Sequence, residues 1–167
     1  MKVYNLHREQ VVPADRDDVF RFFEQPENLA RITPPSMGFV ILTPPPIVMK
    51  EGAVIDYTVR ALGARMHWRT LISEYDPPHK FVDIQIKGPY LMWHHTHRFV
   101  AESGRTRLID DVHYALPFGL LGRMVHRVLV GRQVRRIFDH RQGVISGLFG
   151  SVDETNETSR TPEPDPS

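Results

Sequence analysis

The chain has 167 residues and contains no cysteine. This absence excludes a disulfide framework, a thiol nucleophile and a cysteine-based metal site. It also favours a reducing compartment, so we expect a cytoplasmic protein. No apolar run approaches the roughly 20 residues needed to cross a bilayer, and the first residues, MKVYNLHREQVV, lack the apolar centre of a signal peptide. The sequence therefore predicts no membrane insertion.

An excess of charge of one sign is also missing. The 21 basic and 20 acidic residues leave a formal net charge of +1, so no global field attracts the chain to phosphate. One segment is locally basic and carries Arg123, Arg127, Arg132, Arg135, Arg136 and Arg141. It lacks the interleaved aromatic residues of a single-strand binder. We therefore interpret it as a solvated helix face and predict no nucleic-acid partner.

The composition changes near the C-terminal end. The segment SVDETNETSRTPEPDPS, residues 151–167, is polar and rich in proline, with five acidic residues against Arg160. Such a segment cannot bury enough apolar surface to offset the entropy lost on ordering. We predict one domain over residues 1–149, followed by a disordered acidic tail over residues 150–167.

Hydrophobic periodicity predicts the order of the elements. Residues 3–12 alternate as a strand, after which Asp15 is expected to cap a short helix and Pro26 to begin a second one. Six strand-like segments then follow, separated by short turns, at residues 39–43, 54–62, 65–75, 81–87, 92–102 and 106–116. Residues 119–149 have helical spacing, with a break expected near Gly143.

This β-α-α-β6-α order predicts an α+β fold. A strongly curved, seven-stranded antiparallel sheet has one face to cover, and the long C-terminal helix has one apolar stripe. We expect the sheet to wrap around this helix and to enclose a cavity between the two layers.

The alternation of side chains indicates which residues face the cavity. In 92–102 the more aromatic set points inward, and neighbouring strands add further residues by the same rule. The inward sets of these strands are Trp93, His95, His97 and Phe99; Ile55, Tyr57 and Val59; Met66, Trp68, Thr70 and Ile72; and Leu108, Asp110, Val112, Tyr114 and Leu116. In 81–87 the same rule favours the aliphatic set Val82, Ile84 and Ile86.

Several motifs resemble a known superfamily. They are PENLARITPPSMGF (26–39), DPPHKFVDIQIKGPYLMWHHTHRF (76–99), DDVHYALPFGLLG (110–122) and IFDHR (137–141). The chain resembles the START-related, polyketide cyclase/dehydratase-like superfamily (SRPBCC), which has the helix-grip fold, and in particular its bacterial ligand-binding members. The resemblance covers about residues 3–148. It implies a pocket between sheet and long helix, and it turns Phe81, Asp83 and Gln85 inward in place of the aliphatic set.

The combined prediction is a mainly aromatic pocket that binds or transports a hydrophobic or aromatic small molecule. Apolar contacts are expected from Tyr57, Trp68, Trp93 and Phe99. Orienting polar contacts are expected from Asp83, Gln85, His95, His97, Asp110 and Tyr114.

Three alternatives remain open. His95 and His97 could bind a metal with Asp110 or Asp83, although hydrogen bonds to these acids are the commoner arrangement, and we predict no metal and no cofactor. The same four residues are candidate catalytic groups for cyclisation or dehydration, with non-catalytic binding favoured. A regulatory module that uses the basic helix and the tail is the third alternative. We also leave open a homodimer and an inward turn of Arg132 or Arg136 towards Asp83 or Asp110.

Overall fold

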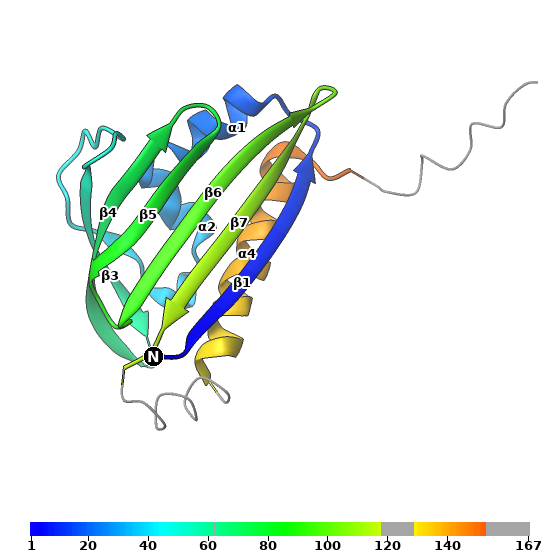
Figure 1. Ribbon diagram of the computed structural model, residues 1–167. Helices are drawn as coiled ribbons and strands as arrows, with labels where there is room; N and C mark the ends of the chain where they lie inside the picture. The colour runs from blue at the N-terminus through cyan, green and yellow to red at the C-terminus, as the bar shows by residue number, and fades with distance from the viewer. Residues whose placement is uncertain (62, 118–128, 153–167) are drawn as a thin grey trace, which may run out of the picture.

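A computed structural model describes residues 1–61, 63–117 and 129–152 (Figure 1). Seven antiparallel strands form one curved sheet in the order β1-β7-β6-β5-β4-β3-β2, and a long helix lies on its concave side. The α+β helix-grip prediction is therefore confirmed. The described residues contain no helix that is long and apolar enough to cross a membrane.

The predicted elements are found with small shifts at their ends. The strands are β1 (Val3–Val12), β2 (Val40–Ile41), β3 (Val54–Ala61), β4 (Ala64–Asp76), β5 (Lys80–Lys87), β6 (Met92–Glu102) and β7 (Arg105–Ala115). The helices are α1 (Arg16–Phe23), η1 (Pro26–Asn28), α2 (Leu29–Ile32), η2 (Pro35–Met37) and α4 (Gly131–Phe149). Only β2 is much shorter than the predicted 39–43 segment.

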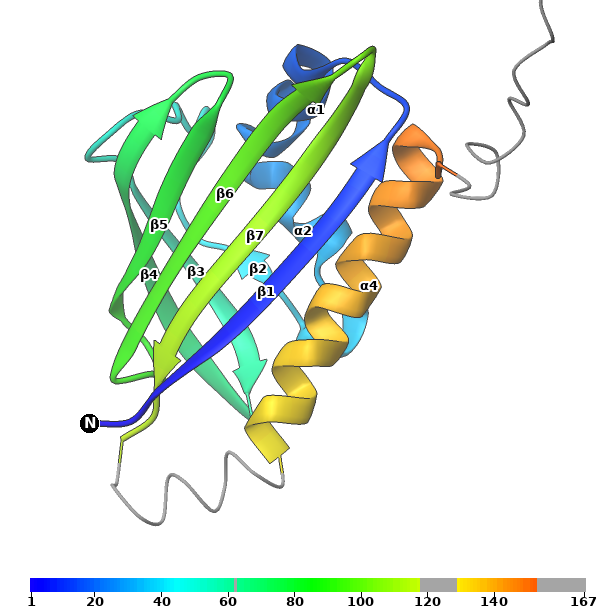
Figure 2. The ribbon, with the colours of Figure 1, turned by 45° about the vertical axis from the view of Figure 1, so that its right-hand side comes forward.

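Two irregularities in the pairing of β4 with β5 accompany the curvature of the sheet. The β4–β5 register shifts between Arg69 and Thr70 and again between Ile72 and Glu74. Extra residues of this kind bend a strand and increase its twist. The sheet can therefore wrap around one side of the helices, as Figure 2 shows.

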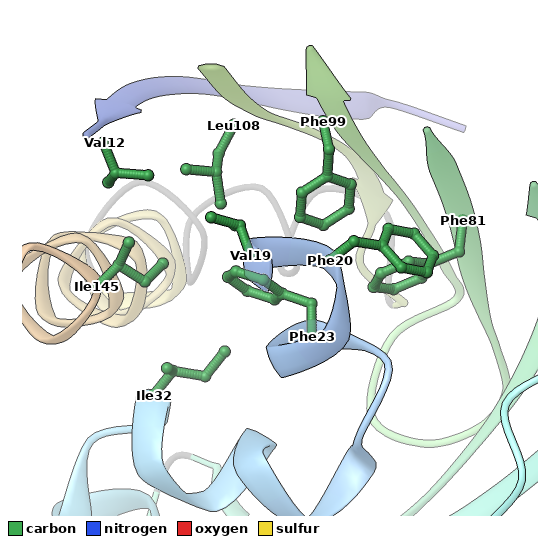
Figure 3. Packing of buried hydrophobic residues seen from close by; sticks show 9 residues of the cluster. All are labelled: Val12, Val19, Phe20, Phe23, Ile32, Phe81, Phe99, Leu108 and Ile145. Carbon is green, nitrogen blue, oxygen red and sulfur yellow. The ribbon is translucent and has the colours of Figure 1, made fainter. Parts of the chain in front are cut away.

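Helix α1 fills one end of the space inside the sheet. Val19, Phe20 and Phe23 point towards Phe99 of β6 and Leu108 of β7 (Figure 3). The ring of Phe20 meets that of Phe99 edge-on, with centroids 5.2 Å apart. Asp15 occupies the N-cap position, but its side chain makes no capping hydrogen bond, so the predicted capping role is wrong.

Helix α4 runs beside β1 and covers the open side of the sheet (Figure 2). The helix continues to Phe149, so the predicted break near Gly143 is wrong. Its buried stripe consists of Gly131, Val134, Phe138, Arg141 and Ile145. Gln10 of β1 also donates to Ser146 at 2.8 Å, which fixes the helix against the sheet edge.

Some predictions lie outside the described residues. The first part of the predicted 119–149 helix, including Arg123 and Arg127, is among them, as are residues 153–167 of the predicted tail.

Candidate functional site

A cavity of about 180 Å³ lies between the concave face of the sheet and the helices. Its apolar wall combines aromatic and aliphatic side chains from β3, β4, β6, α1, α2 and α4. Tyr57, Trp68 and Trp93, all predicted as ligand contacts, lie on this wall. Tyr57 stacks on Trp68 with centroids 5.9 Å apart, and Trp68 meets Trp93 edge-on at 5.3 Å. Both tryptophans of the chain therefore border the same cavity.

Five polar side chains gather at one side of the cavity and form what we call the buried cluster: Asp83, His95, His97, Asp110 and Arg141. The strand register brings four of them together, because Asp83 pairs with His95 across β5–β6 and His97 pairs with Asp110 across β6–β7. His95 Nε2 lies 2.9 Å from Asp110 Oδ1, and His97 Nε2 lies 2.8 Å from Asp83 Oδ2. The two imidazole rings lie against each other at a tilt of 37°, with centroids 3.7 Å apart.

The fifth member, Arg141, comes from α4 and was not predicted. Its Nη2 donates to Asp110 Oδ1 at 3.0 Å and lies 3.1 Å from His97 Nδ1. Arg132 and Arg136, which we considered for this role, are exposed on the outer face of the helix. The helical spacing of the sequence already indicated that Arg141 is buried, since residue 141 continues the apolar stripe from Phe138 to Ile145.

Burial and charge compete at the two carboxyl groups. Burial alone raises the pKa of Asp110, but the Arg141 charge and the hydrogen bonds from both histidines outweigh it and hold this pKa well below the usual value. Burial opposes the ionised form of Asp83 in the same way, yet the hydrogen bond from His97 and the nearby positive groups leave its pKa lowered. Both carboxyl groups are therefore ionised near neutral pH.

His95, unlike the two carboxyl groups, is held in its uncharged form by burial. Burial and the neighbouring His97 lower the pKa of His95 to about 4, despite its hydrogen bond to Asp110. The His95 imidazole is therefore neutral near neutral pH. Because Asp110 Oδ1 is the closer acid, Nε2 of this ring carries the hydrogen that Asp110 accepts.

The buried cluster has a side that faces the cavity and a side that faces away from it. Asp83, His95, His97 and Arg141 border the cavity. Asp110, a predicted ligand contact, is not among the cavity-lining residues, because it lies behind the imidazoles against Arg141. Its contacts suit it to hold the histidines in place.

Three other predicted contacts do not line the cavity. Phe99 packs into the cluster around α1, with its ring 5.3 Å from that of Phe23. Gln85 bends back to bond the Tyr90 backbone, donating to its carbonyl at 2.7 Å. Tyr114 packs its ring 5.7 Å from that of Tyr4, on the first strand.

Strand β5 does not follow simple alternation. Phe81 and Asp83 border the cavity, as the family resemblance implies. Ile86 is 51% exposed, so the aliphatic set does not form the inner face. Val82 is buried as well, which explains why the hydrophobic pattern of this strand pointed the other way.

Sequence reasoning missed the contribution of the helices and loops to the wall. Residues of this group that border the cavity are Phe22, Phe23, Leu29, Met37, Phe39, Met49, Tyr90, Gln133, Ile137 and Phe138. Alternation along strands gives no information on such segments. Three residues of this group, Leu29, Met37 and Phe39, belong to the motif PENLARITPPSMGF, which is one of the motifs that carry the family resemblance.

The family model for polyketide cyclase/dehydrase and lipid transport matches residues 12–139, which is most of the chain. The protein therefore belongs to this family, as the resemblance predicted. No curated protein matches the chain in sequence.

Solved structures with the same architecture are distant in sequence. A protein from Thermus thermophilus shares 15% identity at a TM-score of 0.67, covering 87% of this chain and 99% of its own. The Zhui aromatase/cyclase from Streptomyces sp. R1128 shares 17% identity at a TM-score of 0.65, covering 90% and 100%. A START superfamily protein from Mycobacterium smegmatis shares 15% identity at a TM-score of 0.65, covering 86% and 98%. These similarities establish the fold.

Proposed function

We propose that the protein binds a small hydrophobic or aromatic molecule in the cavity without chemically changing it. The observation that carries this proposal is a cavity whose wall is aromatic and whose polar groups gather on one side. An apolar pocket with a few convergent polar groups is the usual composition of a small-molecule site. The family description, which includes lipid transport, supports the same class of ligand.

The volume of the cavity limits the size of the ligand. A dry cavity of about 150 Å³ accommodates benzene, and the present cavity measures about 180 Å³. A single aromatic ring with a short substituent fits this space, whereas a drug-sized ligand usually occupies at least about 300 Å³. We therefore infer a monocyclic ligand, or the ring end of a longer one.

Two buried nitrogens favour a ligand that also carries a hydrogen-bond acceptor. Among the described residues, neither Trp68 Nε1 nor Arg141 Nε has a hydrogen-bond partner, although both side chains border the cavity. Buried donors of this kind are normally satisfied. A ligand oxygen that reaches one of them after a small side-chain adjustment would supply the missing partner.

Cyclisation or dehydration of a polyketide-like substrate is the second candidate. It is favoured by His95, which borders the cavity while Asp110 accepts the hydrogen on its Nε2. However, a general base works best when its pKa lies near the working pH, and the pKa of His95 is lowered to about 4. Such an imidazole accepts a proton poorly near neutral pH, so we favour binding over turnover.

Tryptophan fluorescence can test the binding proposal. Trp68 and Trp93 are the only tryptophans in the sequence, and both border the cavity. Titration with monocyclic aromatic carboxylates, phenols and alkyl benzenes should produce a saturable change with at least one class, and the same ligand should raise the melting temperature.

Val59→Phe provides the matched variant, because this cavity-lining residue is buried and the larger ring would occupy ligand space. Val100→Phe, at an exposed position of β6, is the control. We expect V59F to weaken binding at least tenfold and V100F to bind as the wild type does. A saturable signal of equal affinity in V59F would place the ligand outside the cavity and contradict the proposal.

A further inference from the structure

We propose that Asp83, His95 and His97 bind a zinc ion at the polar side of the cavity, with Asp110 and Arg141 supporting the two histidines from behind. This goes beyond the proposed function, since the ion would bind whether or not the cavity also takes an apolar ligand. The sequence alone predicted no metal, because two histidines on a strand are weak evidence. The side-chain arrangement supplies the missing evidence.

The three donor atoms already lie close to the required positions. One ligand atom from each of Asp83, His95 and His97 can be chosen so that all three lie within 4.8 Å of one another. Asp83 Oδ2 is 2.8 Å from His97 Nε2 and 3.5 Å from His95 Nδ1. In a tetrahedral zinc site with bonds of about 2.0–2.1 Å, the ligand atoms lie about 3.3 Å apart. Two of the three separations, 2.8 and 3.5 Å, are thus within about 0.5 Å of that spacing, and a rearrangement of the side chains would admit the ion.

The far side of each imidazole is held as metal-binding histidines usually are. His95 Nε2 lies 2.9 Å from Asp110 Oδ1, and His97 Nδ1 lies 3.1 Å from the same oxygen. Each ring thus directs one nitrogen to Asp83 and the other to Asp110. A zinc-bound histidine normally donates its second N–H to a carboxylate or carbonyl, which fixes the ring and its tautomer. One buried carboxylate does this for both rings.

Arg141 holds Asp110 behind the two imidazole rings, where it can accept their N–H groups. Its Nη2 donates to Asp110 Oδ1 at 3.0 Å and so fixes the position of this carboxylate. When zinc occupies His97 Nε2, His97 Nδ1 carries the hydrogen and donates to Asp110. Arg141 then gives up its 3.1 Å contact with His97 and retains the one with Asp110.

The charge of the buried cluster also favours a cation. Two carboxylates, Asp83 and Asp110, face one guanidinium, that of Arg141, which leaves one negative charge without a permanent partner. Uncompensated buried charge is costly. A divalent ion reverses the balance to one positive charge, which hydroxide or an anionic ligand oxygen would neutralise.

The cavity provides the place for that fourth ligand. Asp83, His95 and His97 all border the cavity, whereas Asp110 stands behind the rings. Three protein ligands and one open position distinguish reactive or ligand-binding zinc sites from closed structural ones. The ligand class favoured at an occupied site is therefore an aromatic molecule with a carboxylate, phenolate or enolate oxygen.

The test uses the full chain after removal of metals with EDTA. Titration with Zn²⁺ in isothermal calorimetry should give one ion per chain. Co²⁺ at the same site should show the intense visible bands of a tetrahedral complex, and Zn²⁺ should abolish them. His97→Gln and Asp83→Asn should each weaken Zn²⁺ binding by more than about 100-fold, and Asp110→Asn by about 10–100-fold.

His113→Gln is the matched control, because His113 is an exposed histidine on β7 whose Nδ1 lies 2.8 Å from Asn5 Oδ1. It should bind Zn²⁺ as the wild type does. Circular dichroism in EDTA shows whether each variant is folded, and the cobalt spectrum of the wild type tests the site even if a variant does not fold. Less than one ion per chain, a weak octahedral cobalt spectrum, or equal losses in H113Q and H97Q would overturn the proposal.

The fluorescence titration repeated in EDTA separates this proposal from the previous one. An aromatic ligand that binds the metal-free protein while Zn²⁺ does not bind would leave the proposed function standing and reject the zinc site. Zinc binding without any response to aromatic ligands would support the zinc site and reject the proposed function.

Discussion

Replacement of Arg141 by methionine would remove the guanidinium that pairs with the buried Asp110 carboxylate while keeping a long apolar side chain in its place. In the wild type this guanidinium donates to Asp110 at 3.0 Å and lies 4.9 Å from the centre of the Phe23 ring. Methionine retains much of the packing against Phe23. The variant therefore isolates the loss of charge from the loss of volume.

The magnitude follows from the burial of the groups left behind. Removing one partner of a buried ion pair costs about 3–5 kcal/mol, because the other charge stays buried without compensation. Arg141 is 6% exposed and Asp110 8% exposed, so water replaces the lost contact poorly. We expect a loss of about 3–5 kcal/mol in the free energy of unfolding at pH 7. At about 2–4 °C per kcal/mol, the melting temperature falls by about 6–20 °C.

The pH dependence gives a second check with a defined sign. The pKa of Asp110 is depressed in the folded protein, so its stabilising contribution is present above the unfolded-state pKa of about 3.9 and is lost as the pH falls through the folded-state pKa. Without Arg141 the folded-state pKa of Asp110 rises. The difference in unfolding free energy between wild type and R141M should therefore shrink as the pH falls through the higher folded-state pKa that Asp110 has in the variant.

Urea denaturation at several pH values measures both effects. Arg136→Met is the control, because Arg136 lies on the exposed face of the same helix and its loss should change stability by no more than about 0.5 kcal/mol. Equal losses in R141M and R136M, or a difference that grows at low pH, would refute the assignment of Arg141 as the stabilising charge of the cluster.

Two further predictions concern α4 and the outer face of the sheet. Gly143→Ala should raise the free energy of unfolding by about 0.5–1 kcal/mol in urea titration, because the position is exposed within a continuous helix and a Cβ there meets nothing within 4 Å. Gly150→Ala should instead destabilise, because φ is +90° there and an added Cβ would lie 3.0 Å from Pro13 Cγ. No gain in G143A would indicate a broken helix. Hydrogen bonds to Asp111 at 2.6 Å and to Glu9 raise the pKa of His7, so NMR titration should find it above 6.5 and lower in Asp111→Asn. The stabilisation from this raised pKa is present below about pH 6.5 and is lost as the pH rises through the folded-state pKa. An unchanged titration of His7 in D111N would contradict the pairing of His7 with Asp111.

The sheet could be predicted because its strands alternate and its turns are short. Strand β6 was predicted at 92–102 and is observed at Met92–Glu102, and β1 also matches its predicted range. The helices were harder because their ends depend on tertiary packing. Gly143 costs helix propensity, yet the buried residues on both sides of it, Arg141 and Ile145, hold the helix together.

The cavity wall could be predicted only where a strand presents it. Tyr57, Trp68, Trp93, His95 and His97 border the cavity, as alternation implied. Phe99 belongs to the same alternating set but lies nearer the end of β6, where α1 packs against the sheet and occupies the space. Alternation determines the face of a side chain, and the elements that cover that face determine whether a cavity remains there.

Arg141 shows how a charged residue within an apolar pattern can be interpreted. Its position between Phe138 and Ile145 on the buried stripe of α4 requires burial of the guanidinium, and a buried charge requires an anionic partner. The inward-facing acids of the neighbouring sheet, Asp83 and Asp110, are the groups that can meet this requirement. Assigning each arginine of this segment to a face of the helix therefore distinguishes Arg141, on the buried face, from Arg132 and Arg136, on the exposed face. The same assignment places the polar side of the cavity next to Arg141.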